Sequence, residues 1–132
     1  MSIKSSQQLV EEANQNIETL NASEVKQLFD KNEITLIDVR DIRELWKEGT
    51  IKNSIHIPRG MLEFWLDPQS SYFQEKKIGE IKNIVLYCAL GFRSALATKA
   101  LKEMGFKNVA NASGGFDALK NAGLEVVNKE RK

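Results

Sequence analysis

The chain has little cysteine, histidine or proline. Its 132 residues include one cysteine, Cys88, one histidine, His56, and two prolines. A single cysteine excludes an internal disulfide and a zinc site built from cysteines, and the carboxylates are scattered, so we expect no metal and no cofactor. His56 lies far from Cys88 in sequence, within a short predicted strand, and we expect no catalytic role for it. A lone reactive thiol is typical of a reducing compartment, so we predict a cytoplasmic location.

The chain also lacks an excess of one charge and any long apolar run. Its net charge of +1 gives no sign of nucleic-acid binding. No apolar stretch approaches the length that spans a bilayer, and the first residues show no secretory signal pattern. Hydrophobic residues (42%) and charged residues (28%) are in ordinary proportion for one soluble domain with one core. We therefore expect neither nucleic acid nor a membrane as a partner.

Strand and helix patterns alternate along the chain. Apolar runs at residues 34–39, 54–58, 84–87 and 109–112 predict strands. Helical patterns are found at residues 5–16, 43–47, 61–66, 94–104 and 116–121, and a further helix begins after the capping pair Asn21 and Glu24. The alternation indicates an α/β fold with a parallel sheet covered on both faces. In such folds ligands bind beyond the carboxyl ends of the strands, where Asp38, Cys88 and the Gly114-Gly115 turn are expected to meet.

Cys88 follows the apolar run 84–87 and opens a short loop. The residues after it are Ala89, Leu90, Gly91, Phe92, Arg93 and Ser94, and a helical pattern starts at once. A loop of backbone amides at a helix N-terminus makes a cradle for an anion, and such a cradle favours the thiolate, the reactive form of cysteine. An inert buried cysteine, the alternative, does not explain the glycine and arginine that follow. We therefore predict that Cys88 is a covalent nucleophile.

Three other residues are predicted to act at the same site as Cys88. Arg93 is expected to hold an anionic sulfur group and to lower the thiol pKa. Ser94 is expected first to be the N-cap of the following helix, and second to donate its hydroxyl to the sulfur. Arg59 follows a strand-ending proline at the same edge of the sheet. For Arg59, binding of an anionic donor and a solvated surface position are equally open.

Three ordered signatures resemble the rhodanese-like sulfurtransferase family in its small single-domain form. They are residues 36–40 with Glu44, 49–51 and 54–58; the loop 88–94; and residues 105–106 with Val109 and 114–116. The resemblance covers residues 20–126. It implies a five-stranded, mostly parallel sheet with helices on both faces, preceded by an appendage helix. We accordingly divide the chain into a helical extension (1–18), a rhodanese-like domain (19–128) and a basic tail (129–132).

The resemblance also implies roles for named residues. Cys88 takes a sulfane sulfur from thiosulfate, polysulfide or a persulfide, holds it as a persulfide, and passes it to a thiol or cyanide; a protein persulfide could be the partner. Asp38 orders the active-site loop from behind, and Arg40 pairs with a carboxylate, for which Glu44 is the candidate. The chain has Thr50 where the family has histidine and Leu119 where it has tryptophan. We expect both to be packing positions.

Two other functions remain open. A non-enzymatic persulfide carrier or protein-binding module is suggested by the N-terminal helix and the region around Trp65. Phosphatases and arsenate reductases also use a thiolate in an amide cradle closed by arginine, but with five residues between the two. Here four intervene between Cys88 and Arg93, and the smaller cradle favours sulfur over phosphate.

Overall fold

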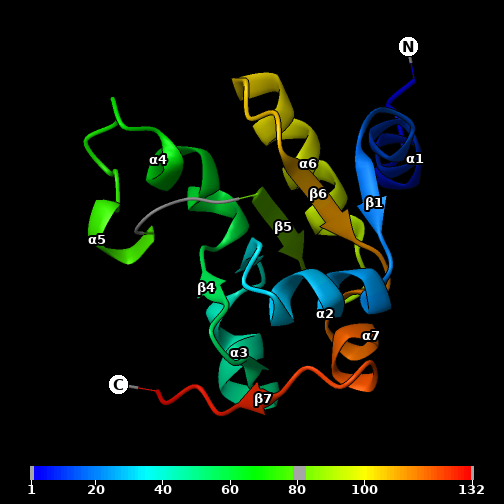
Figure 1. Ribbon diagram of the computed structural model, residues 1–132. Coiled ribbons are helices and arrows are strands. Elements are labelled where there is room, and N and C mark those ends of the chain that lie inside the picture. Colours follow the sequence, from blue (N-terminus) through cyan, green and yellow to red (C-terminus); the bar gives the residue numbers. More distant parts are fainter. Residues whose placement is uncertain (1, 79–82, 132) are drawn as a thin grey trace.

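A five-stranded parallel sheet forms the centre of the molecule (Figure 1). The structure is a computed structural model that describes residues 2–78 and 83–131; Met1 of the predicted extension and Lys132 of the predicted basic tail lie outside the described residues. Across the sheet the strand order is β1 (Glu18–Leu20), β6 (Val109–Ala112), β5 (Asn83–Tyr87), β2 (Ile34–Asp38) and β4 (Ile55–His56). All neighbouring pairs are parallel, which confirms the predicted sheet.

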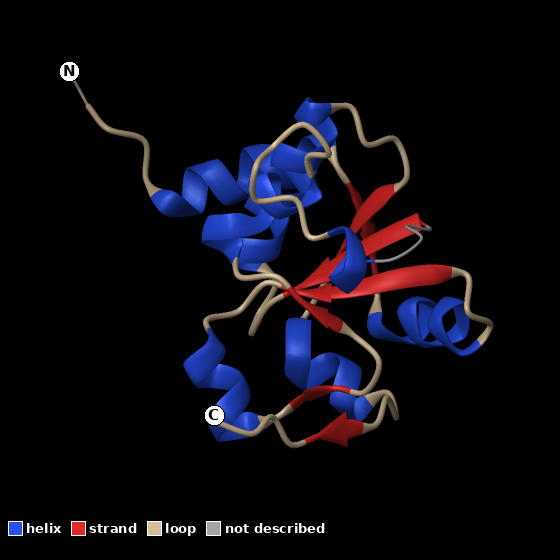
Figure 2. Ribbon diagram, turned by 90° about the vertical axis from the view of Figure 1, so that its left-hand side faces the viewer, coloured by secondary structure: helices blue, strands red, loops and turns tan. Residues whose placement is uncertain are grey.

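A second, two-stranded sheet lies apart from the first (Figure 2). It pairs β3 (Thr50–Ile51) with β7 (Val126–Val127) in antiparallel register. Neither strand was predicted, because two residues are too few to show a periodicity. The pair joins the carboxyl-terminal segment to the middle of the chain.

Helices cover both faces of the sheet, as the alternating pattern predicts. In chain order they are α1 (Ser6–Asn16), α2 (Ala22–Asp30), α3 (Ile42–Glu48), the 3-10 turn η1 (Arg59–Met61), α4 (Leu62–Leu66), α5 (Glu75–Ile78), α6 (Phe92–Met104) and α7 (Gly115–Asn121). The predicted capping box of α2 is confirmed, because the Asn21 side chain accepts from the Glu24 amide at 2.9 Å and the Glu24 carboxylate accepts from the Asn21 amide. At the C-terminus of α6, Gly105 is the C-cap and has a left-handed backbone, with φ 107°.

The core has two layers, one on each side of the sheet. One layer joins α4, α5 and α6 to the sheet and includes Cys88. The other joins α2 and α7 to the opposite face and includes Leu119, so the predicted packing role of that leucine is confirmed. Alternate residues of β5 enter opposite layers, as expected for a strand that is buried on both faces.

Helix α1 packs against α6 rather than projecting away from the domain (Figure 1). Its Ala13 is buried, and Lys102 of α6 donates a hydrogen bond to the Asn16 carbonyl at its end. Ser5 caps the helix and Gln8 completes the capping box. Among residues 2–78 and 83–131, no helix is long and apolar enough to cross a membrane.

Candidate active site

Cys88 lies at the carboxyl end of β5, inside the turn that leads into α6. Its side chain is buried, and Sγ accepts hydrogen bonds from the Gly91 amide (3.2 Å), the Ser94 amide (3.4 Å) and the Ser94 hydroxyl (3.3 Å). The cradle predicted from the sequence is therefore present. Donors converge on one sulfur from the loop and from the first turn of the helix.

These donors favour the thiolate of Cys88. Burial raises the pKa of the Cys88 thiol, but the hydrogen bonds from the Ser94 hydroxyl and from the amides of Ser94, Gly91 and Leu90 outweigh it, so the pKa is lowered from its ordinary value. A lowered pKa increases the fraction of nucleophilic thiolate near neutral pH. The predicted role of Cys88 as a covalent nucleophile stays a prediction, and the lowered pKa is compatible with it.

The N-cap prediction for Ser94 is wrong, while its predicted hydrogen bond to the thiol is confirmed. Helix α6 begins at Phe92, and Gly91 occupies the N-cap position with φ 101°. The left-handed backbone of Gly91 turns the chain into the helix two residues sooner than predicted. Ser94 therefore sits in the first turn, where its hydroxyl points to Cys88.

The Ser94 hydroxyl provides a test of how the thiolate is stabilised. We expect the alkylation rate of Ser94→Ala by iodoacetamide at pH 7 to be roughly tenfold lower, because a hydrogen bond to a charged acceptor is lost. The midpoint of the pH–rate profile should shift upward, since the wild-type pKa is lowered partly by this donor. Thr98→Val is the matched control, because that buried hydroxyl donates to the Ser94 carbonyl and not to sulfur. Equal profiles for Ser94→Ala and wild type would contradict this assignment.

Arg93 forms a two-pronged ion pair with Glu44 of α3. Arg93 Nη1 and Nη2 lie 2.7 Å and 2.9 Å from the two carboxylate oxygens. This pair raises the pKa of Arg93 and lowers that of Glu44. The predicted pairing of Glu44 with Arg40 is therefore wrong. Arg93 lies beside the thiol loop as predicted, and its role in holding an anionic sulfur stays a prediction.

Asp38 and Arg40 form a buried pair at the end of β2. Both side chains are 0% exposed, and Arg40 Nη2 donates to Asp38 Oδ2 at 2.8 Å. Asp38 also accepts from the Thr50 hydroxyl at 2.9 Å, and that hydroxyl hydrogen-bonds to Tyr87 as well. Thr50 is thus a hydrogen-bonding position and not the packing position that we expected. Asp38 holds Arg40 and Thr50 at the carboxyl end of β2, the strand that pairs with β5. Ordering of the Cys88 loop by Asp38 stays a prediction.

Arg59 and His56 lie at the same end of the sheet. The Arg59 amide donates to the Val39 carbonyl, and its guanidinium pairs with Glu63 at 2.9 Å. Anion binding by Arg59 stays a prediction. His56 Nε2 donates to the Arg40 carbonyl at 2.7 Å, and burial lowers the pKa of this imidazole. His56 is therefore a hydrogen-bonded, partly buried histidine.

Asn111 and Gly115 support the loop. The sequence predicted that the Gly114-Gly115 turn lies near Cys88, but it did not single out Asn111. Asn111 of β6 donates from Nδ2 to the Gly91 carbonyl at 3.2 Å, so it holds the residue whose amide faces the thiol. Gly115, with φ 62°, lies directly against the Cys88 and Ala89 carbonyls. The sequence offered one signal for Asn111, which is the polar residue in the otherwise apolar predicted strand 109–112.

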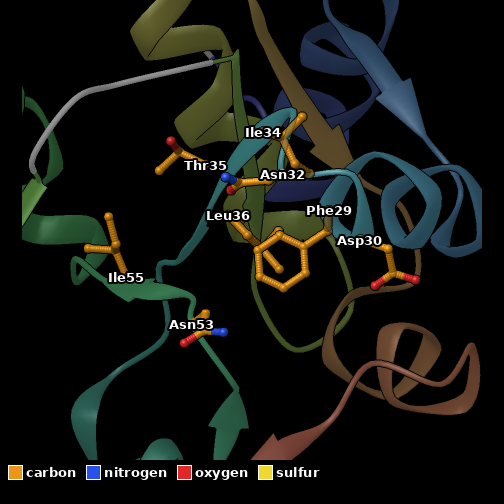
Figure 3. A pocket seen from close by; sticks show the side chains of 8 residues that line it. All are labelled: Phe29, Asp30, Asn32, Ile34, Thr35, Leu36, Asn53 and Ile55. Atoms are coloured by element: carbon orange, nitrogen blue, oxygen red, sulfur yellow. The ribbon is translucent and has the colours of Figure 1, made fainter.

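A separate hollow lies at the opposite end of the strands (Figure 3). Its volume is about 440 Å³, and Phe29, Asp30, Ile34 and Ile55 are among its lining residues. It adjoins the start of β2 and of β4, whereas Cys88 follows the end of β5. Its lining holds no cysteine or histidine, and we do not assign it to the candidate site. In the described part of the chain, no cluster of three or more histidine, cysteine or acidic residues could hold a metal ion.

Fold and site together define a class of protein: a parallel α/β domain with a buried cysteine in an amide loop at a helix N-terminus. The family model of the Rhodanese-like domain matches residues 21–122. The chain belongs to this family. Family membership supports a function of the rhodanese sulfurtransferase type.

Known relatives differ in how much of this chain they share. A structure from Rhodopseudomonas palustris CGA009, of a protein of unknown function described as a possible tyrosine phosphatase, is 41% identical and has a TM-score of 0.87; the match covers 96% of this chain and 98% of that one. The polysulfide-sulfur transferase homodimer of Wolinella succinogenes is 36% identical, with a TM-score of 0.71 over 92% of this chain and 85% of that one.

A curated relative is a much longer protein. The tRNA uridine(34) hydroxylase of Photorhabdus laumondii is 33% identical over 99 residues, which make up 75% of this chain. The match spans only 27% of the length of that relative. A second curated relative, the putative mitochondrial thiosulfate sulfurtransferase of Schizosaccharomyces pombe, is matched over 59% of its length. The likeness therefore concerns the rhodanese-like domain and not the whole of either relative.

Proposed function

We propose that this protein transfers a sulfane sulfur from thiosulfate, polysulfide or a persulfide, through a persulfide on Cys88, to a thiol or cyanide. The observation that carries this proposal is the Cys88 thiol, whose pKa is lowered by amides and the Ser94 hydroxyl. The polysulfide-sulfur transferase among the structural relatives supports the same chemistry.

The reaction needs two displacements at sulfur. The Cys88 thiolate attacks the outer sulfur of the donor, a new S–S bond forms, and the donor's S–S bond breaks with its electron pair leaving on sulfite or a thiolate. An acceptor thiolate or cyanide then attacks the outer sulfur of the persulfide, and the Cys88 thiolate leaves. The amides of Gly91 and Ser94 and the Ser94 hydroxyl stabilise the thiolate at the start and end of the cycle.

The length of the loop favours sulfur chemistry over phosphate chemistry. Four residues intervene between Cys88 and Arg93, fewer than the five of phosphatase and arsenate reductase loops, so the cradle is smaller. The guanidinium of Arg93 is paired with both oxygens of the Glu44 carboxylate and also interacts with the Cys88 sulfur. The amides of Gly91 and Ser94 and the Ser94 hydroxyl supply the remaining donors to that sulfur.

The test is thiocyanate formation from cyanide with thiosulfate or polysulfide as donor. We expect wild type to form thiocyanate and Cys88→Ser to lose activity by roughly three orders of magnitude or more, because the nucleophile is removed. After incubation with donor, the mass of the wild-type protein should increase by one sulfur atom. Because Cys88 is the only cysteine, wild type alkylated with iodoacetamide serves as a control with the sequence unchanged.

Other outcomes would identify the alternatives. A persulfide on Cys88 that never yields thiocyanate would identify a carrier. Cys88-dependent hydrolysis of p-nitrophenyl phosphate, with no thiocyanate formed, would overturn the proposal in favour of a phosphatase, the description given to the relative from Rhodopseudomonas palustris.

A further inference from the structure

Glu44 reaches the Cys88 loop from a distant part of the chain. It belongs to the first turn of α3, whereas Arg93 belongs to the first turn of α6, 49 residues later. The two carboxylate oxygens of Glu44 accept hydrogen bonds from Nη1 and Nη2 of Arg93 at 2.7 Å and 2.9 Å. A pair that is bonded through both oxygens has a defined geometry, so α3 helps to determine where the guanidinium lies.

Arg93 is shared between Glu44 and the thiol. The Glu44 carboxylate and, to a smaller extent, the Cys88 sulfur interact with the guanidinium and raise the pKa of Arg93. Within the loop 88–94 only Arg93 carries a positive charge, and its side chain is 42% exposed. An anion that approaches Cys88 therefore meets a cation whose charge is already compensated in part by a carboxylate.

Glu44 is held in place by a second contact. Its Oε2 accepts a hydrogen bond from the Asp41 amide at 3.0 Å, which completes the capping box of α3. The hydrogen bonds from Arg93 are the main reason why the pKa of Glu44 is lowered, so this carboxylate is charged at neutral pH. Asp41 also interacts electrostatically with Arg93, and Glu11 of α1 lines a hollow together with Arg93. Further negative charge thus lies near the guanidinium.

The other arginine expected at this edge of the sheet is paired in the same way. Arg59 donates to the Glu63 carboxylate at 2.9 Å, and both side chains are half-buried. Each of the two arginines for which anion binding is predicted therefore has a glutamate as its partner. Such pairs attract a dianion less strongly than free guanidinium groups do, because each pair presents little net charge.

We propose that Glu44, by compensating the charge of Arg93, makes the active site prefer singly charged sulfur donors, such as a thiosulfonate or an alkyl persulfide, over the thiosulfate dianion. The inference rests on the proposed sulfur transfer and names the class of donor. Glu44 bonds to Arg93 and to the Asp41 amide, and it acts on the reacting sulfur through Arg93. It is therefore a positioning residue that determines specificity.

The test compares two donors that differ in charge. Thiosulfate is a dianion, whereas methanethiosulfonate is a monoanion in which a methyl group replaces an oxygen. With either donor the Cys88 thiolate attacks the outer sulfur, and the S–S bond of the donor breaks with its electron pair leaving on sulfite or on methanesulfinate. Cyanide then removes the sulfur as thiocyanate. The ratio of kcat/KM for the two donors measures the charge preference.

Glu44→Gln removes the charge and preserves the shape of the side chain. Glutamine completes a capping box as glutamate does, so α3 is expected to remain folded. We expect kcat/KM for thiosulfate, relative to methanethiosulfonate, to rise about fivefold, because a negative charge is lost from a partly exposed ion pair. Most of the change should be a lower KM for thiosulfate, and it should diminish as salt is added.

Glu103→Gln is the matched control. It removes the same charge from the pair that Lys99 and Glu103 form on α6. Its position is roughly 15 Å further along that helix than Arg93, at the usual rise per residue. We expect the ratio for the two donors to be the same in this variant as in wild type.

A second measurement of the charge preference needs no sulfur transfer. Iodoacetate is an anion and iodoacetamide is uncharged, and both alkylate Cys88, the only cysteine. The ratio of their rates reports attraction of the anion, because the fraction of thiolate is common to both reactions and cancels. We expect this ratio to rise in Glu44→Gln and to stay at the wild-type value in Glu103→Gln.

The outcomes separate this inference from the proposed function. Unchanged ratios in Glu44→Gln, or an equal rise in Glu103→Gln, would overturn the role of Glu44. A wild-type preference for thiosulfate, measured against the same ratio for a small free thiol, would overturn the donor class. If wild type forms no thiocyanate from either donor while the alkylation ratio rises in Glu44→Gln, the proposed function is contradicted and the role of Glu44 is supported.

Discussion

Gly115→Ala is expected to destabilise the protein by about 3–5 kcal/mol, through backbone strain and overpacking. Gly115 has a left-handed backbone, with φ 62°. A Cβ placed there would lie 2.3 Å from the Ala89 carbonyl oxygen and 2.6 Å from that of Cys88. Both obstacles are backbone atoms of the active-site loop, so neither can rotate aside as a side chain could.

The substitution should also reduce activity beyond its effect on stability. The Phe116 amide donates to the Cys88 carbonyl at 2.8 Å, so α7 and the loop are held together where the methyl group would intrude. A displacement of about 1 Å at a reacting group can cost roughly a hundredfold in rate. We expect kcat/KM for thiosulfate and cyanide to fall by about that factor under conditions where the variant is folded.

Urea denaturation and steady-state cyanolysis provide the measurements. Gly60→Ala is the matched control, because nothing lies within 4 Å of its Cβ position and its backbone is not left-handed. Its unfolding free energy should remain within about 0.5 kcal/mol of wild type. A Gly115→Ala variant with wild-type stability and activity would show that the conformation of the Cys88 loop does not require a glycine at position 115.

The Cys88 cradle could be predicted because its contacts are local. The groups that meet Sγ come from Gly91 and Ser94, three and six residues along the chain. The strand before the loop, the glycine within it and the start of the helix after it can each be recognised in the local sequence, and together they define the path of the loop backbone. The start of the helix was misplaced only because the left-handed Gly91 ends the turn earlier than the serine suggested.

Contacts distant in sequence could not be predicted in the same way. Glu44 and Arg93 are 49 residues apart, and Asn111 and Gly91 are 20 apart. With charges of both signs scattered along the chain, many pairings were equally compatible with the pattern. The partner of Arg40 was mispredicted for a different reason, since both candidate carboxylates are close in sequence. Arg40 pairs with Asp38 because both side chains are enclosed at the same strand end. Strands of two or three residues, such as β1 and β3, are likewise defined by their partners and not by their own sequence.

Asp38→Asn is expected to destabilise the fold by about 3–5 kcal/mol, because it removes the buried counter-charge of Arg40 and leaves the exposed carboxylate of Glu48, 3.7 Å from Nη1, as its ion-pair partner. Arg40 donates to Asp38 from both Nε and Nη2, and the centroid of the Phe116 ring lies 4.1 Å from the guanidinium carbon of Arg40. In this enclosed position water cannot replace the lost carboxylate. Replacing both partners, as Asp38→Leu with Arg40→Met, should cost less than the single change, since no charge is then left buried.

The sequence holds a matched control for this pair. Asp41 and Arg43 have the same spacing and a 3.0 Å ion pair, but both side chains are exposed. Asn is also a good N-cap for α3, so Asp41→Asn should leave the urea midpoint nearly unchanged. Because the Asp38 carboxylate bonds to Arg40 and Thr50, cyanolysis by the folded fraction of Asp38→Asn should stay close to wild type. A large loss of kcat with unchanged stability would instead make Asp38 part of the chemistry.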